Sequence, residues 1–121
     1  MWAPFAQVLA GQGIVFNLYL LAYVISPRSC HAFVGYLEEQ AVHTYTKAIE
    51  DLDAGKLPAW ECLAAPDIAK LYWRLGPDAR MRDLLLAVRA DEASHRDVNH
   101  ELSVINTDDP NPFIQGSKKS A

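Results

Sequence analysis

Apolar and polar residues alternate along most of this chain with the period of a helix. From Pro27 to Asp53 the apolar side chains recur at intervals of three and four, which places them on one face of a helix. Ser26 followed by Pro27 is a typical helix start, because serine caps the first turn and proline suits the first helical position. Gly55 is expected to end this helix, and Pro58 follows it.

The second half of the chain predicts a short helix and a long one. Residues 54–66 form a connection, and the short helix is expected over residues 67–75. Residues 76–78, Gly-Pro-Asp, break it, and Asp78 is a candidate cap for a last helix that runs to about Ile105. The tail, residues 107–121, should be irregular. No strand shows clear alternation, so the sequence predicts an all-α protein with a single domain over residues 1–121.

The most apolar stretch is residues 5–25. Its clean apolar run, Ile14 to Ile25, is shorter than the about 20 residues of a membrane-spanning helix. Its polar residues lie five apart and share no helical face, so the amphipathic pattern is weak. Trp2, Tyr19 and Tyr23 are residue types that favour a lipid headgroup boundary. Three interpretations stay open: a buried helix of a soluble protein, a helix that lies on a membrane surface, or a poor membrane-spanning helix.

Composition narrows the classes of function. The chain has 121 residues, of which 50% are hydrophobic and 21% charged, as in a globular domain with a modest core. The net charge of -4 and the lack of a basic stripe give no reason to expect a nucleic-acid partner. Cys30 and Cys62 form no recognisable motif and are expected to be reduced thiols. The N-terminus has neither a signal peptide nor a transit peptide pattern, so no targeting peptide is expected in this chain.

The first candidate for chemistry is the pair Glu92 and His95. The two residues are three positions apart in a predicted helix and therefore share a face. Most pairs of this kind lie on a solvated surface. Here, however, they continue an apolar stripe that includes Leu85 and Val88, and a carboxylate is seldom buried unless it is paired or bound to a metal. Iron and manganese accept this mixture of oxygen and nitrogen ligands.

The second candidate is Glu38, which falls on the apolar stripe of the preceding helix. His31 and Tyr45 lie seven residues before and after it, two turns away on the same face. Either Glu38 pairs with a basic group, or it faces a metal. Together with Glu92 and His95 it suggests half of a carboxylate-bridged di-iron site, since such four-helix bundles use single glutamates on two helices and Glu-x-x-His on the other two.

The segments that carry these residues resemble a known family. "LAYVISPRSCHAFVGYLEEQAVHTYTKAIEDL", "KLYWRL" and "RADEASHRDVNH" are similar to blocks of the alternative oxidases, the cyanide-insensitive ubiquinol oxidases. The resemblance runs from about residue 11 to 114. It implies a ferritin-like di-iron four-helix bundle, of which this chain supplies roughly the C-terminal half.

The resemblance also implies roles for individual residues. Glu38 and Glu92 would be bridging ligands of a pair of iron ions, His95 a further ligand, and Tyr45 a redox-active catalytic tyrosine. Three residues match groups that orient the ligands or pass protons and electrons: His31, Trp73 and Asp91. Three more match the ubiquinol pocket: Ala41, Thr44 and Gln40. At the last of these the family usually has a glutamate, which puts quinol binding or proton delivery in question.

The activity implied is that of a ubiquinol:oxygen oxidoreductase, which reduces O2 to water without pumping protons. Such a protein would be monotopic, on the matrix face of the mitochondrial inner membrane, with a dimer suggested. The family's first two ligand helices lie upstream of this chain. We therefore expect the chain to be incomplete and inactive alone, unless two copies pair. The alternatives are a non-enzymatic helical protein of the membrane surface and a ferritin-like iron-binding protein without quinol chemistry.

Overall fold

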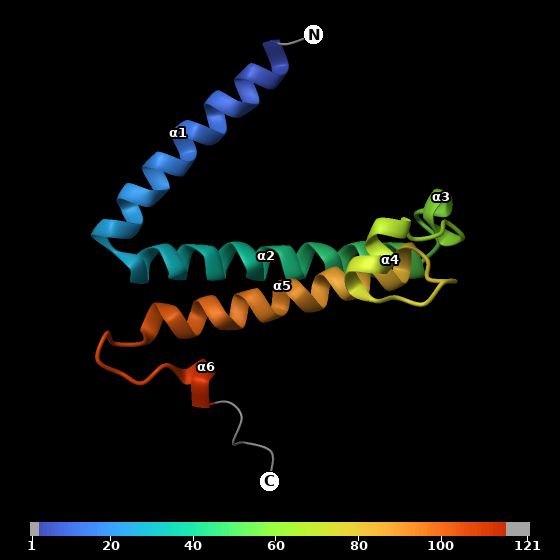
Figure 1. Ribbon diagram of the computed structural model, residues 1–121. Coiled ribbons are helices and arrows are strands. Elements are labelled where there is room, and N and C mark those ends of the chain that lie inside the picture. The colour runs from blue at the N-terminus through green and yellow to red at the C-terminus, as the bar shows by residue number, and fades with distance from the viewer. Residues whose placement is uncertain (1–2, 116–121) are drawn as a thin grey trace.

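Two long helices dominate the computed structural model, which describes residues 3–115 (Figure 1). Helix α2 (Pro27–Asp53) and helix α5 (Met81–Val104) lie side by side and antiparallel. The other helices of the described chain are α1 (Ala3–Ile25), α3 (Pro58–Glu61), α4 (Asp67–Trp73) and α6 (Pro112–Gln115). Among the described residues there is no strand, only an isolated bridge between Ala64 and Arg80, so the all-α prediction is confirmed.

The ends of α2 follow the local signals in the sequence. The Ser26 hydroxyl accepts a hydrogen bond from the backbone N–H of Ser29 at 3.4 Å, and Pro27 occupies the first turn. At the other end Gly55 has a φ of 70°, in the left-handed region that glycine adopts without strain. The predicted limits of this helix are therefore confirmed.

Other boundaries differ from the expectation. The predicted connection contains the one-turn helix α3, and α4 ends two residues early because Arg74 turns left-handed, with a φ of 52°. Asp78 does not cap α5. That helix begins at Met81, and the Asp83 carboxylate accepts a hydrogen bond from the Arg80 backbone N–H at 2.8 Å. Helix α6 lies in the predicted irregular tail, whose last six residues are outside the described part.

The core of the helix pair is small and lies toward the end where α2 stops. Ile49, Leu52 and Leu85 form it and are buried. The partly buried residues that pack against it are Tyr45, Ala48, Leu57 and Leu86. A core of this size leaves much of the stability of the pair to other contacts between the two helices.

Those other contacts fix both ends and the spacing of the pair. At one end the Arg82 guanidinium donates two hydrogen bonds to the Asp53 carboxylate, at 2.7 and 2.9 Å. At the other end Arg28 donates to the backbone carbonyls of Ser103 and Val104, which are orphan acceptors at the C-terminus of α5. Near this end Gly35 lets α5 approach closely, because a Cβ here would lie 3.2 Å from His100 Nδ1.

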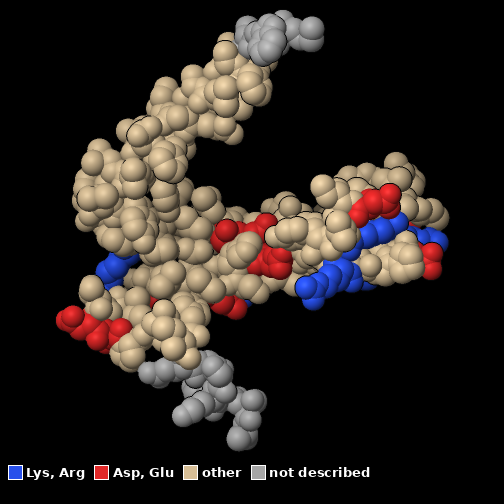
Figure 2. Space-filling view, in the orientation of Figure 1, with Lys and Arg blue, Asp and Glu red and all other residues tan. Residues whose placement is uncertain are grey.

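Helix α1 extends away from the pair, and its apolar side chains are exposed (Figure 1). The other described elements therefore do not bury this helix, and its surroundings stay a prediction. Pro4–Ile25 forms one unbroken helix of 22 residues with a mean hydropathy of 1.8, longer than the clean apolar run suggested. By length and composition alone it is able to cross a membrane. Figure 2 shows no charged side chain on it. Trp2 lies outside the described residues.

Candidate metal centre

Glu38, Glu92 and His95 come together midway along the α2–α5 pair. One carboxylate oxygen of each glutamate and one ring nitrogen of His95 all lie within 4.8 Å of one another. Because the two helices are antiparallel, the middle of α2 lies opposite the middle of α5, and this arrangement brings residues 54 positions apart into one group. The structure thus places together the three residues that the sequence predicted as metal ligands.

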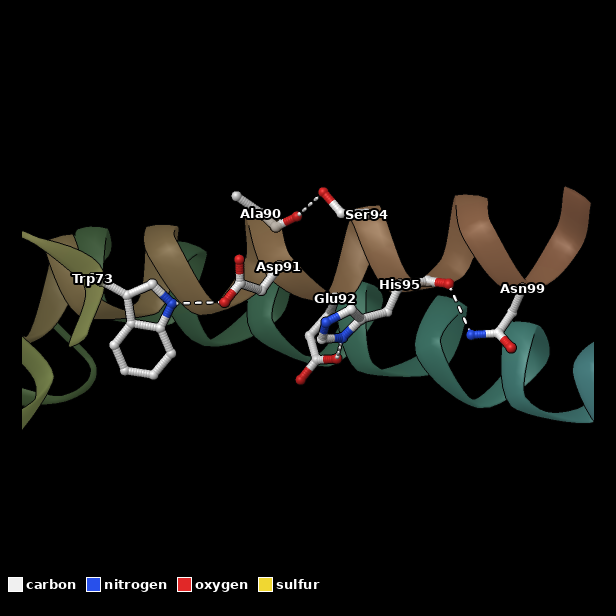
Figure 3. Close-up of polar contacts among 7 residues, drawn as sticks. All are labelled: Trp73, Ala90, Asp91, Glu92, Ser94, His95 and Asn99. Atoms are coloured by element: carbon white, nitrogen blue, oxygen red, sulfur yellow. Dashed lines mark hydrogen bonds and ion pairs between the residues drawn. The ribbon is translucent and has the colours of Figure 1, made fainter. Parts of the chain in front are cut away.

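Helix periodicity orients the two groups of α5. Glu92 and His95 are three residues apart, and both side chains leave the same face of the helix (Figure 3). His95 Nδ1 lies 3.4 Å from Glu92 Oε2. The Glu92 side chain is 23% exposed and that of His95 is 59% exposed, so the group is open to solvent on the His95 side. Glu38 is half-buried.

The electrostatics of the group favour a bound cation. Hydrogen bonding to the Glu92 carboxyl raises the pKa of Glu38, and partial burial and the negative charge of Glu92 act in the same direction. A positive charge on His95 opposes this rise. Among the described residues no lysine or arginine forms an ion pair with either glutamate, so the paired-glutamate interpretation finds no such partner. Figure 2 shows acidic side chains gathered at this level.

The donor set fits the metal that the resemblance implies. Two carboxylates and one imidazole, each offering one atom to a common point, are ligands that iron and manganese accept. A divalent cation here would also offset the repulsion between the two carboxylates, which adds to the hydrogen bond and the burial that raise the pKa of Glu38. These residues therefore fit iron.

Helix α4 covers one side of the group and is fixed to α5 by a single strong contact. The Trp73 indole N–H donates to Asp91 Oδ2 at 2.7 Å, directly beside Glu92 (Figure 3). An open pocket of about 400 Å³ lies between the two helices and is lined by apolar residues of α4 together with Asp91, Glu92 and His95. Trp73 and Asp91 thus border the group, and their role in orienting ligands stays a prediction.

His31 takes part in a hydrogen-bonded chain that the sequence did not predict. Its Nδ1 lies 2.9 Å from Asn99 Oδ1, and its Nε2 lies 3.2 Å from the Tyr23 hydroxyl. Asn99 Nδ2 in turn donates to the His95 backbone carbonyl at 2.9 Å. Asn99 lies four residues after His95, so helical period places the two on one face of α5. The part played by Tyr23 depends on how α1 meets α2, for which the sequence has no signal.

The remaining predicted residues lie on α2, and among the described residues no side-chain hydrogen bond joins them to the three ligand residues. The Tyr45 ring packs against the apolar core. Gln40 and Thr44 are exposed, and the Thr44 hydroxyl donates to the Gln40 backbone carbonyl at 2.9 Å within the helix. Ala41 is half-buried. None of these four lines the pocket between α4 and α5, and their roles stay predictions.

Comparisons with known proteins agree with the resemblance. Residues 2–104 match the family model described as "Alternative oxidase". A protein of Venturia inaequalis named "Alternative oxidase, mitochondrial" is 59% identical over 114 residues, which cover 93% of this chain and 32% of the relative. Proteins with the same name are 56% identical over 114 residues in Aspergillus niger and 50% identical over 121 residues in Pyricularia oryzae, covering 93% and 97% of this chain. The chain spans about a third of the length of these curated relatives.

Proposed function

This chain belongs to the alternative oxidase family, and from that premise we propose that it supplies part of the di-iron centre of a ubiquinol:oxygen oxidoreductase. The observation that supports this proposal is the convergence of Glu38, Glu92 and His95 within 4.8 Å. These residues are roughly half of the ligands that di-iron bundles use. The remaining ligands come from helices other than those described, in the same protein or in a second copy.

Each of the three residues has a distinct part in holding iron. Glu38 and Glu92 would hold the iron through their carboxylate oxygens and would supply negative charge. His95 would supply a nitrogen ligand. Bound iron would supply the electron-transfer steps by which O2 is reduced to water as quinol is oxidised. Trp73 holds the Asp91 carboxylate beside Glu92 and so restrains the turn of α5 that carries the ligands.

Quinol oxidation requires groups that accept an electron and protons on the α2 side of the site. We assign the electron relay to Tyr45 and the binding of the quinol head to Ala41, Thr44 and Gln40. A carboxamide at Gln40 offers a hydrogen bond but takes up no proton. Proton acceptance therefore falls on other groups near the centre.

The exposed apolar helix α1 indicates where such a protein works. A helix with no charged residue and with exposed apolar side chains on all sides is suited to lipid. We assign the chain to the matrix face of the mitochondrial inner membrane, held there as a monotopic protein by α1. A dimer follows from the same family resemblance.

The metal part of the proposal is tested on the chain itself. The chain is purified in detergent and loaded anaerobically with Fe(II), and bound iron per chain is measured beside Glu38→Ala and Glu50→Ala. Glu50 is an exposed glutamate of the same helix and serves as the matched control. We expect up to about one iron per chain, retained in Glu50→Ala and lost in Glu38→Ala. Equal iron in the two variants would contradict the assignment.

The oxidase part is tested in a longer protein. The matching segment of the Venturia inaequalis relative is replaced by residues 2–104 of this chain, and quinol-dependent O2 uptake is measured in membranes. We expect the chimera to consume O2 and to lose this activity with Glu38→Ala, which removes a bridging ligand. A chimera that binds iron yet consumes no O2 would agree with the proposed iron site and would overturn the oxidase assignment.

A further inference from the structure

A continuous chain of hydrogen bonds joins the exposed helix α1 to the turn of α5 that carries His95. It starts at the Tyr23 hydroxyl, 3.2 Å from His31 Nε2, where the two rings also meet edge to face with centroids 5.5 Å apart. His31 Nδ1 lies 2.9 Å from Asn99 Oδ1, and Asn99 Nδ2 lies 2.9 Å from the His95 carbonyl oxygen. Three helices and one proposed metal ligand are thus connected through four residues.

The chemistry of the end groups fixes the direction of two bonds in this chain, and a neutral His31 ring fixes the third. The His95 carbonyl only accepts, so the Asn99 side chain must present its NH2 group to it and its oxygen to His31. That oxygen only accepts, so His31 Nδ1 carries the hydrogen and donates. In the neutral ring Nε2 is then the acceptor, and the Tyr23 hydroxyl donates to it. Each donor meets an acceptor, and one tautomer of His31 satisfies the whole chain.

The position of His95 depends on this turn because its side chain has little else to hold it. The imidazole is 59% exposed, so packing restrains it weakly. Its backbone carbonyl, by contrast, receives the Asn99 side chain in addition to the usual helical N–H of the same residue. A group that restrains the backbone of a metal ligand restrains the direction in which the ligand points.

We infer that Asn99 is a positioning residue for His95, and that its hold extends through His31 to Tyr23, so that the docking of α1 on α2 is linked to the geometry of the metal centre. The inference rests on the proposed function, because it gives His95 the part of a ligand. It predicts that a change on α1, far along the chain from residues 92–95, alters the turn at His95 and Asn99.

The link itself is tested without metal. The full chain is labelled with ¹⁵N and held in detergent micelles, and the side-chain NH2 resonances of Asn99 are followed in Tyr23→Phe and Tyr19→Phe. Tyr19 is the matched control, since its hydroxyl also reaches from α1 to α2 but donates to the Cys30 carbonyl at 3.3 Å. We expect the Asn99 resonances to move in Tyr23→Phe and to stay in place in Tyr19→Phe. Equal behaviour of the two variants would overturn the link.

The consequence for metal binding is tested with Co(II) alone, whose visible absorption reports both affinity and ligand geometry. Asn99→Ala is compared with Asn17→Ala, because Asn17 donates in the same way to the Gly13 carbonyl, at 2.7 Å, with no onward partner. We expect Asn99→Ala to lower Co(II) affinity about tenfold and to change the spectrum, with Asn17→Ala unchanged and helix content equal in both. Equal affinity in the two variants would overturn the positioning role.

The two measurements separate the failure of this inference from the failure of the proposed function. If the unmodified chain binds no more Co(II) than Glu38→Ala does, the metal centre is wrong and the NH2 resonances alone decide whether Tyr23 and Asn99 are linked. If Asn99→Ala fails to fold, Tyr23→Phe carries the affinity test. In that case we expect a smaller loss of Co(II) affinity than in a folded Asn99→Ala, and no loss in Tyr19→Phe.

Discussion

Helix α1 and the α2–α5 pair differ in the exposure of their apolar side chains. Val15 and Phe16 of α1 are each 66% exposed, whereas Ile49 of α2 and Leu85 of α5 are 5% and 6% exposed. The pair concentrates its apolar residues on one stripe of each helix, and α1 has them on all sides. A helix with one apolar face is covered by another helix of the chain, and a helix without a preferred face requires a different environment.

The same comparison explains where the polar chemistry lies. Each helix of the pair carries polar residues on its inner stripe, and the antiparallel arrangement brings Glu38 opposite Glu92 and His95. Helix α1 contributes no charged group to the structure, only the hydroxyls of Tyr19 and Tyr23 where it meets α2. The pair therefore provides the site, and α1 provides attachment to the membrane in the proposed function.

The largest expected effect is on membrane binding by the exposed apolar side chains of α1. Phe16→Lys with Leu20→Lys places two charges on α1, and we expect binding to phosphatidylcholine vesicles to fall by about a hundredfold or more, since each lost apolar side chain contributes roughly 1.5–3 kcal/mol. Sedimentation with vesicles measures this. The control is the double change Ile68→Lys with Leu71→Lys on α4, whose side chains are 79% and 81% exposed. An equal loss in the control would show that α1 is not the membrane-binding element.

Much of the fold could be predicted because its signals are local. The start and end of α2 are set by Ser26, Pro27 and Gly55, each within a turn of the boundary it marks. Helices α3 and α6 could not be predicted, since four residues are too few to show a period. The prediction of Asp78 as the cap was wrong, because the helix starts later, at Met81, and the Asp83 carboxylate accepts the hydrogen bond of the Arg80 N–H.

The residues of the site also fall into those that could be predicted from local signals and those that could not. Glu38, Glu92 and His95 could be predicted as one group because helical period puts each on the inner stripe and an antiparallel pair then brings the stripes together. The contact between His31 and Asn99 joins residues 68 positions apart, and the contact of Tyr23 depends on the angle between α1 and α2. Neither the contact between distant residues nor the angle between two helices can be predicted from the spacing of residues in the sequence.

A smaller effect on the free energy of unfolding is expected when leucine replaces a glycine that other atoms crowd, compared with a glycine in open space. In Gly35→Leu the new side chain meets the His100 ring, whose nearest atom would lie 3.2 Å from the Cβ. Such overpacking costs about 1–3 kcal/mol of the free energy of unfolding. Gly13→Leu on α1 has nothing within 4 Å of its Cβ and should cause no loss. Urea unfolding followed by circular dichroism in detergent compares the two, and equal losses would show that α2 and α5 are not held this closely at Gly35.

The smallest effect concerns the ion pair at one end of α2–α5. The Arg82 guanidinium, through its hydrogen bonds, holds the pKa of Asp53 below its usual value. A carboxyl whose pKa is lower in the folded than in the unfolded chain stabilises the fold above its unfolded pKa, and the contribution disappears as the pH falls through the folded pKa. Unfolding measured across the acid range should thus depend less on pH in Asp53→Asn.

Solvent limits the size of this last effect, since the Arg82 and Asp53 side chains are 49% and 47% exposed. The matched control is Asp108→Asn, an exposed aspartate beyond the end of α5, which should keep the pH dependence of the unmodified chain. Added salt should weaken the contribution of Asp53 by screening and leave the effect of Gly35→Leu unchanged. An equal reduction of the pH dependence of the free energy of unfolding in Asp108→Asn and Asp53→Asn would show that the ion pair of Arg82 and Asp53 does not hold the ends of α2 and α5 together.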